Sequence, residues 1–318
     1  MSDRRDAVRW ITSDLSLVTR IGIAALTSWI VPERLWDPVT GMIGEAMVRW
    51  NAGMPSRQSR EIAEVLYPAS AQELRAVHVE RIASGHASRL YGLREYRRGA
   101  HRLRIRLTGD EHVLQALQRG RGAILWIGRF AFASFVSKVA LHERGFRVSH
   151  LSRPSHGFGT SPFAVRRLNP IWTRVEEKYL QERMVMVPGR ETSVLRTLRR
   201  RLAKNEIVSI AVGSEGIQTV SVPLLAGQLR LASGPVSLSL ASGAPLLPVF
   251  TVRDRERGFE VTVDAPLELP AHMARKEHVE FVARQYAQRL APFVRDYPGQ
   301  WLGSSGTTPP ERYDPRAT

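Results

Sequence analysis

The chain has 318 residues, a formal net charge of +16, 43% apolar and 24% charged residues, and no cysteine. The length and composition are typical of a soluble globular fold with one large domain or two small ones, and the lack of cysteine excludes disulfides, thiolate metal sites and cysteine nucleophiles. The positive charge favours acidic or phosphate-bearing partners, such as nucleic acid, anionic lipid headgroups, coenzyme A or an acidic carrier protein.

The first hundred residues predict helices. Residues 70–96 carry apolar side chains at nearly helical spacing, and Ser70 with Glu73 predicts a capping box at the start of that helix.

An apolar run at residues 21–31 raises the question of a membrane. It is well short of the roughly 20 residues that a spanning helix needs, and no small-residue cleavage site of a secretory signal follows it. Two interpretations remain open. The run forms a buried core helix, or it forms a helix that lies on a membrane with Trp29 and Trp36 at headgroup level.

From about residue 103 the pattern changes to alternating strands and helices. Strands are expected at 103–107, 122–128, 146–151, 184–187, 207–213, 245–253 and 258–269. Helices are expected at 109–120, 132–145, 160–182, 191–206, 233–243 and 276–296. This alternation predicts an α/β fold with a mainly parallel sheet flanked by helices. We therefore expect an N-terminal helical segment at 1–100, an α/β domain at 101–302 and a loose tail at 303–318.

Ligands of open α/β sheets bind beyond the carboxyl ends of the strands. Four loops lie there, at 128–134, 152–159, 188–192 and 213–218. They offer cations for a phosphate, one histidine and one carboxylate: Arg129, Ser134, Arg153, His156, Arg190, Ser214 and Glu215. The glycines of 213–216 allow close backbone approach, but the lysine of a phosphate loop is missing.

Several sequence blocks in a fixed order carry a family resemblance. They are 108–130, Asn169-Pro170, Arg190, 195–216, 242–269 and the terminal 297–302. This order resembles the lipid A biosynthesis acyltransferases, a branch of the lysophospholipid acyltransferase superfamily, over roughly residues 57–302. Glu215-Gly216 stands where the wider superfamily has a Glu-Gly pair for the acceptor headgroup.

The resemblance implies transfer of an acyl group from an acyl carrier protein or coenzyme A thioester to a lipid or glycolipid hydroxyl, without a metal or another cofactor. Basic charge suits an acidic carrier and an anionic membrane surface. A substrate-binding role is expected for Phe130, Arg153, Arg190, Ser214, Glu215 and Gly216. We expect a cytoplasmic protein, with peripheral attachment to the inner face of the cytoplasmic membrane left open.

The family's catalytic pair is His-x4-Asp/Glu, in which the histidine takes the acceptor proton and the carboxylate orients the ring. This chain has Arg129 and Ser134 at those positions. Arginine stays protonated at neutral pH and cannot act as a general base. Its charge can still bind a phosphate or polarise the thioester carbonyl.

His156, in a glycine-containing loop, is the best-placed substitute base, whereas His150 is expected to be a strand-end residue without a role. His272 with Glu277 matches the motif formally, but nine histidines and 30 acidic residues make one such pair expected by chance.

Three hypotheses follow. The first is an acyltransferase with an altered site that uses His156, substrate assistance or an amine acceptor. The second is a non-catalytic relative that binds acyl chains or an acyl carrier protein as a partner or scaffold. The third, nucleic-acid binding, is the weakest, because no zinc finger, recognition-helix pattern or aromatic RNA-binding signature is present.

Overall fold

The computed structural model describes residues 2–50, 57–98, 103–187, 189–213, 218–270 and 273–303. The N-terminal part contains four helices and a short 3₁₀ turn: α1 (Ser2–Ile30), η1 (Glu33–Leu35), α2 (Trp36–Trp50), α3 (Arg57–Val65) and α4 (Ala71–Arg98). The predicted capping box is confirmed at the start of α4, where the Ser70 amide and hydroxyl both donate to Glu73 Oε2 at 2.7 Å.

A seven-stranded sheet with the order β1-β9-β8-β2-β5-β3-β4 follows. Its strands are β1 (Ile105–Thr108), β2 (Ala123–Ile127), β3 (Val148–Ser152), β4 (Glu182–Val185), β5 (Ile207–Ala211), β8 (Leu246–Asp254) and β9 (Gly258–Val263). All neighbours are parallel except β8 and β9, which are antiparallel. The prediction of a mainly parallel α/β fold is confirmed.

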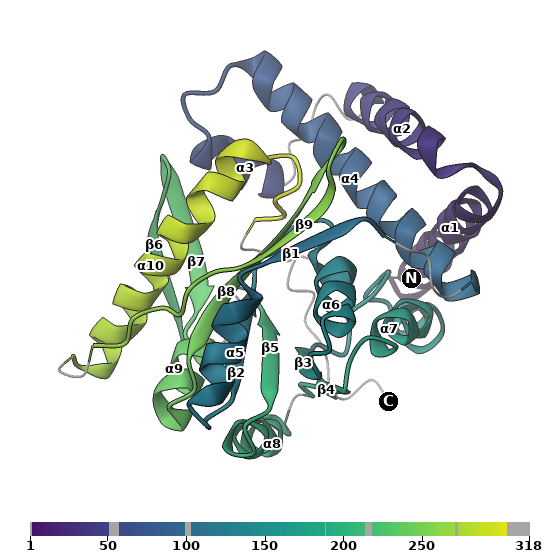
Figure 1. Ribbon diagram of the computed structural model, residues 1–318. Helices are drawn as coiled ribbons and strands as arrows, with labels where there is room; N and C mark the ends of the chain where they lie inside the picture. The colour runs from purple at the N-terminus through teal and green to yellow at the C-terminus, as the bar shows by residue number, and fades with distance from the viewer. Residues whose placement is uncertain are drawn as a thin grey trace.

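Helices cover both faces of this sheet (Figure 1). They are α5 (Asp110–Gln118), α6 (Ala133–Glu143), the π turn η2 (Ala164–Leu168), α7 (Asn169–Glu177), α8 (Glu191–Ala203), α9 (Gly234–Ser242) and α10 (Arg275–Asp296). Helices α4, α6 and α7 pack together on one face, and α8, α9 and α10 on the other. Strand β2 lies at the centre and is buried throughout, as its apolar sequence predicts.

A two-stranded antiparallel hairpin, β6 (Thr219–Leu224) and β7 (Gly227–Ala232), was not expected from the sequence. Its strands alternate between buried and exposed residues, but its turn is Leu225-Ala226 rather than an Asn-Gly type pair. Leu225 adopts a positive φ of 51°, which the sequence does not signal.

The apolar run at 21–31 lies almost wholly in α1 and has two different faces. Ile21 and Ala25 are buried, whereas Ile23 and Ile30 are 59% and 74% exposed. Trp36 is fully buried in the core, so the interpretation that placed it at headgroup level is wrong for this residue. Within the described ranges, no helix is both long and apolar enough to cross a membrane.

An ion pair ties the N-terminal helices to the sheet. The Arg253 guanidinium donates to Asp37 Oδ1 at 2.5 Å and to Oδ2 at 3.0 Å, and it lies 5.4 Å from the centre of the Tyr91 ring. Both charged side chains are largely shielded, at 15% and 31% exposure.

We expect Asp37→Asn to lower the free energy of unfolding by about 1–3 kcal/mol, because a partly buried guanidinium loses its charged partner. Urea denaturation measures this loss. The matched control is Glu280→Gln in the exposed Arg284–Glu280 pair, which should cost less than about 0.5 kcal/mol. Equal losses in the two variants would contradict a special role for Asp37.

Candidate active site

The turn after β2 is hydrogen-bonded to the segment at 300–302, which follows α10. The Ala131 amide donates to the Gln300 carbonyl at 2.8 Å, and the Leu302 amide donates to the Arg129 carbonyl at 2.8 Å. Phe130 forms an isolated bridge with Trp301. The terminal segment therefore fixes the backbone at the family's catalytic turn.

The two side chains at the family's catalytic positions follow this turn. Arg129 and Ser134 are both half-buried, and Ser134 lies in the first turn of α6. Lys138 lies one helical turn after Ser134, so both side chains project from the same face of α6.

A histidine–carboxylate pair lies beside that face. His156 Nε2 is 2.9 Å from Glu176 Oε1 and 3.0 Å from Oε2. Glu176, in α7, is fully buried, and the His156 side chain is 28% exposed. This arrangement has the two chemical components of the family's motif, although neither residue occupies a motif position.

Two further groups hold the Glu176 carboxylate. Lys138 Nζ donates to Oε2 at 2.6 Å, and the Trp172 indole donates to Oε1 at 2.7 Å. Burial alone would raise the pKa of the Glu176 carboxyl, but Lys138 and His156 outweigh it and hold the pKa well below its usual range. Burial lowers the pKa of the Lys138 ammonium, and Glu176 opposes that shift. The carboxylate is therefore ionised.

The ionised carboxylate determines the tautomer of His156. A carboxylate only accepts hydrogen bonds, so the neutral imidazole carries its hydrogen on Nε2 and its lone pair on Nδ1. Among the hydrogen bonds of the described residues, none involves Nδ1 of His156. The ring thus presents a basic nitrogen away from Glu176.

The loop that carries His156 is held by Asn169. The Asn169 Oδ1 accepts hydrogen bonds from the Phe158 and Gly159 amides at 2.8 and 3.1 Å, and its Nδ2 donates to the Ser155 and Gly159 carbonyls at 3.3 and 2.8 Å. Asn169 is 2% exposed. Asn169, the first residue of the Asn-Pro block, therefore holds the His156 loop in place.

We expect Asn169→Ala to lower the free energy of unfolding by about 2–4 kcal/mol, because four partly buried backbone groups lose their partner. Transfer activity should fall as well, since the His156 loop is released. Asn205→Ala is the control, because Asn205 also bonds backbone groups, the Gly122 amide and the Leu117 carbonyl, but does so elsewhere. It should lower stability while the rate per folded molecule stays unchanged, and a similar rate loss in both variants would contradict the assignment.

A close contact between α4 and α7 supports the cluster around Glu176, which consists of Lys138, His156, Trp172 and Glu176. A Cβ at Gly92 of α4 would collide with the Trp172 ring, so only glycine lets the two helices approach this far. Trp172 in turn makes an edge contact with Phe158 at 5.6 Å. The indole that binds Glu176 is therefore fixed from two sides.

His150 lies in β3 and is buried, with Nδ1 2.8 Å from the Ser209 hydroxyl. Burial lowers its pKa well below the usual value, and the Lys138 charge lowers it further. His150 is therefore neutral, and it lies near enough to Lys138 and Glu176 to be affected by their charges.

The other predicted site residues are dispersed. Phe130 is buried at 2% exposure, 6.4 Å from the Phe293 ring centre, whereas Arg153 and Arg190 are exposed. Ser214, Glu215, Gly216 and His272 lie outside the described residues.

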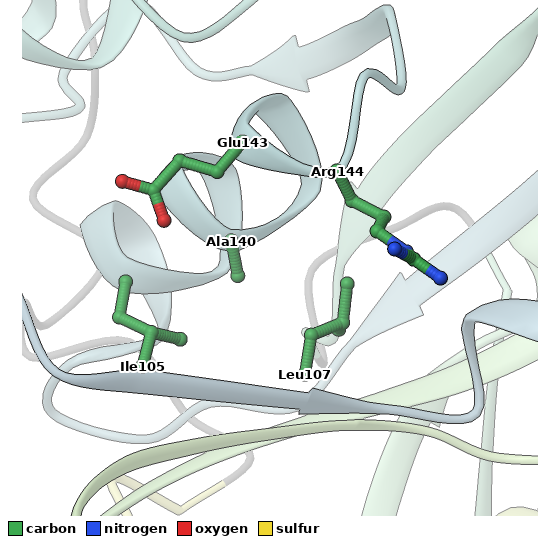
Figure 2. A pocket seen from close by; sticks show the side chains of 5 residues that line it. All are labelled: Ile105, Leu107, Ala140, Glu143 and Arg144. Atoms are coloured by element: carbon green, nitrogen blue, oxygen red, sulfur yellow. The ribbon is translucent and has the colours of Figure 1, made fainter.

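A cavity of about 160 Å³ lies between β1 and the end of α6 (Figure 2). Ile105 and Leu107 point from the strand toward Ala140, with Glu143 and Arg144 on either side. None of the predicted site residues lines it, and Arg144 already binds Asp110.

Within the described chain, no group of three or more His, Asp or Glu residues could hold a metal.

Glu176, Lys138 and Trp172 were missed in the sequence. One available signal was Lys138 itself, because it interrupts an apolar stretch of a helix that is nearly all buried. A lysine in such surroundings needs a buried counter-charge. Trp172 and Glu176 are four residues apart in α7, which is the spacing of neighbours on one helix face.

The model of the bacterial lipid A biosynthesis acyltransferase family matches residues 12–303, which is most of the chain. A search of curated proteins gave no match. The match extends the resemblance of residues 57–302 into α1 and α2. The chain belongs to the bacterial lipid A biosynthesis acyltransferase family.

Proposed function

We propose that this protein transfers a fatty acyl group from an acyl carrier protein or acyl-CoA thioester to a lipid, glycolipid or amine acceptor, with His156 as general base. The observation that carries the proposal is the contact between His156 Nε2 and the buried Glu176 carboxylate. Family membership supports an acyl donor and a lipid-like acceptor in general.

The proton movements follow from the tautomer. Nδ1 of His156 takes the proton of the acceptor hydroxyl or amine, and the acceptor atom bonds to the thioester carbonyl carbon. As the carbon–sulfur bond breaks, the imidazolium returns its proton to the leaving thiolate. Glu176 stabilises the imidazolium through Nε2, and the products are an ester or amide and a free thiol.

Arg129 provides a permanent positive charge at the site. The residue lies between the end of β2 and the first turn of α6, and the N-terminus of that helix also favours negative charge. We assign it to the oxyanion that develops on the carbonyl oxygen, or to a phosphate of the donor or acceptor. Ser134, one turn before Lys138, lies on the helix face that leads to Glu176.

A specific observation favours a second candidate function. Arg129 and Ser134 replace both members of the family's catalytic pair, as expected of a non-catalytic relative that binds an acyl chain or acyl carrier protein. In that case the Lys138–Glu176–His156 cluster is a structural network.

The N-terminal segment, residues 1–100, is proposed to lie against the inner face of the cytoplasmic membrane. Leu26 and Ile30 of α1 and Met42 and Trp50 of α2 are exposed by 55%, 74%, 72% and 91%. Such side chains, with a net charge of +16, suit peripheral binding to an anionic bilayer.

The test is a transfer assay with purified protein, acyl carrier protein or coenzyme A thioesters, and a panel of lyso-lipid, glycolipid and amine acceptors. Mass spectrometry of the product and release of free thiol should both report turnover. Thioester binding without turnover, unchanged by Arg129→His, would instead support the non-catalytic function. A salt-sensitive affinity for DNA well above that for acyl carriers would overturn both.

A further inference from the structure

Three basic side chains meet between α1 and α4. The Trp29 indole donates to the Leu93 carbonyl at 3.2 Å, and the Arg97 guanidinium lies 4.9 Å from the Trp29 ring centre. Ile21 and Ala25 of α1 also pack with Leu93 of α4 in one buried cluster, so the two helices lie side by side. Arg20 directly precedes Ile21, and His86 and Arg89 lie seven and four residues before Leu93, so the three side chains lie on adjoining segments of α1 and α4. The Arg20 charge acts on both His86 and Arg89. His86 and Arg89 are three residues apart and share a face of α4.

Within the described chain, no carboxylate pairs with Arg20, His86 or Arg89. Arg20 Nε donates a hydrogen bond to the Ser16 carbonyl at 3.2 Å. Burial lowers the pKa of His86, and Arg89 and Arg20 lower it further; burial and then Arg20 lower the pKa of Arg89. Both arginines still present surface to solvent. Like charges gathered in this way repel one another unless an anion lies between them.

An apolar stripe borders the cations. Ile23 and Leu26 follow Arg20 at helical spacing on α1 and are 59% and 55% exposed. A ligand that satisfies both features has a negatively charged head and apolar chains. This combination favours a phosphorylated lipid over a nucleic acid or an acidic protein.

The cluster also lies close to the His156 loop. The Ser161 hydroxyl donates to Asp14 Oδ1 at 2.5 Å, and Leu17 lies against Gly159. Arg20 follows Leu17 by about one helical turn. The same helix thus contacts the loop of the proposed base and carries one of the cations.

We propose that Arg20, His86 and Arg89 form a binding site for the phosphate group of a lipid whose apolar chains lie along Ile23 and Leu26. The inference rests on the proposed function for one point, namely that this lipid is, or accompanies, the acyl acceptor. The site itself needs no turnover.

The experiment measures binding to phosphatidylcholine vesicles with and without phosphatidic acid, in the absence of any acyl donor. The variant Arg20→Gln/Arg89→Gln should bind phosphatidic acid vesicles about tenfold or more weakly, because charge-assisted hydrogen bonds to phosphate are lost. The control Arg196→Gln/Arg200→Gln removes the same charge from exposed positions of α8. Since α8 lies at the bottom of Figure 1, far from α1 at the right, this control should lose less than about threefold.

Three outcomes would overturn the proposal. Equal losses in the two double variants would indicate general charge attraction. Equal wild-type binding to vesicles of zwitterionic phosphatidylcholine alone would exclude recognition of an anionic phosphate headgroup. If inorganic phosphate competes as well as short-chain phosphatidic acid, the site takes free phosphate rather than a lipid.

Thermal unfolding separates a binding role from a structural one. Removing two repelling charges should leave the Tm of the Arg20→Gln/Arg89→Gln variant unchanged or raised, and a clear fall would assign these arginines to the fold. Because binding is measured without a donor, specific lipid binding by a wild type that transfers nothing refutes only the proposed function. Transfer without specific vesicle binding refutes only this inference.

Discussion

His156→Gln should lower the acyl-transfer rate by about 10²–10⁴-fold, the range lost when a positioned general base is removed. The fold should persist, because Glu176 keeps its bonds to Lys138 and Trp172. The loss of unfolding free energy should be at most about 1.5–3 kcal/mol, the value of a hydrogen bond to a charged group. Steady-state transfer rates and urea denaturation of the same preparations measure both quantities.

The matched control is His142→Gln. His142 lies in the last turn of α6, is exposed, and makes an edge contact with Tyr179 at 5.5 Å. Its replacement should change the rate by less than about threefold, because exposed substitutions away from a site are nearly neutral. A His156→Gln variant as active as this control would remove His156 from the mechanism and leave substrate assistance as the remaining route to activity.

The regular part of the fold was predictable because each element has a strong local signal. The run at 122–128 is uniformly apolar and became β2, and the Ser70–Glu73 pair marked the start of α4. The β6–β7 hairpin was missed because its turn depends on Leu225 in a positive-φ conformation. The hairpin packs against α10 and α3, and this tertiary packing stabilises it. The sequence of the turn gives no sign of that packing.

The candidate site was predictable only in part. The sequence placed His156 in a loop at the carboxyl edge of the sheet, because the loop follows a strand in a chain of alternating strands and helices. Its partner Glu176 is 20 residues away, beyond a π turn, and a carboxylate within a helix is ordinarily a solvated one. The pairing depends on how α6, α7 and the loop pack, and on Gly92 allowing Trp172 to approach.

Glu176→Gln should lower the free energy of unfolding by about 3–5 kcal/mol, because it leaves the Lys138 ammonium buried without a counter-charge. The double variant Lys138→Met/Glu176→Gln removes both charges and should recover most of that loss, since an apolar side chain of similar length replaces the lysine. Urea denaturation of Glu176→Gln, of Lys138→Met alone and of the double variant gives the coupling energy. Additive losses would show that the two charges do not interact.

Activity should not recover with stability in that double variant. A glutamine amide can donate to Nε2 of His156, which would place the ring hydrogen on Nδ1 and remove the base. We expect the transfer rate of the folded double variant to stay about 10²–10⁴-fold below wild type, as for an oriented imidazole held in the wrong tautomer. Recovery of both stability and rate would mean that Glu176 serves the fold alone, whereas recovery of stability without rate assigns it to positioning His156.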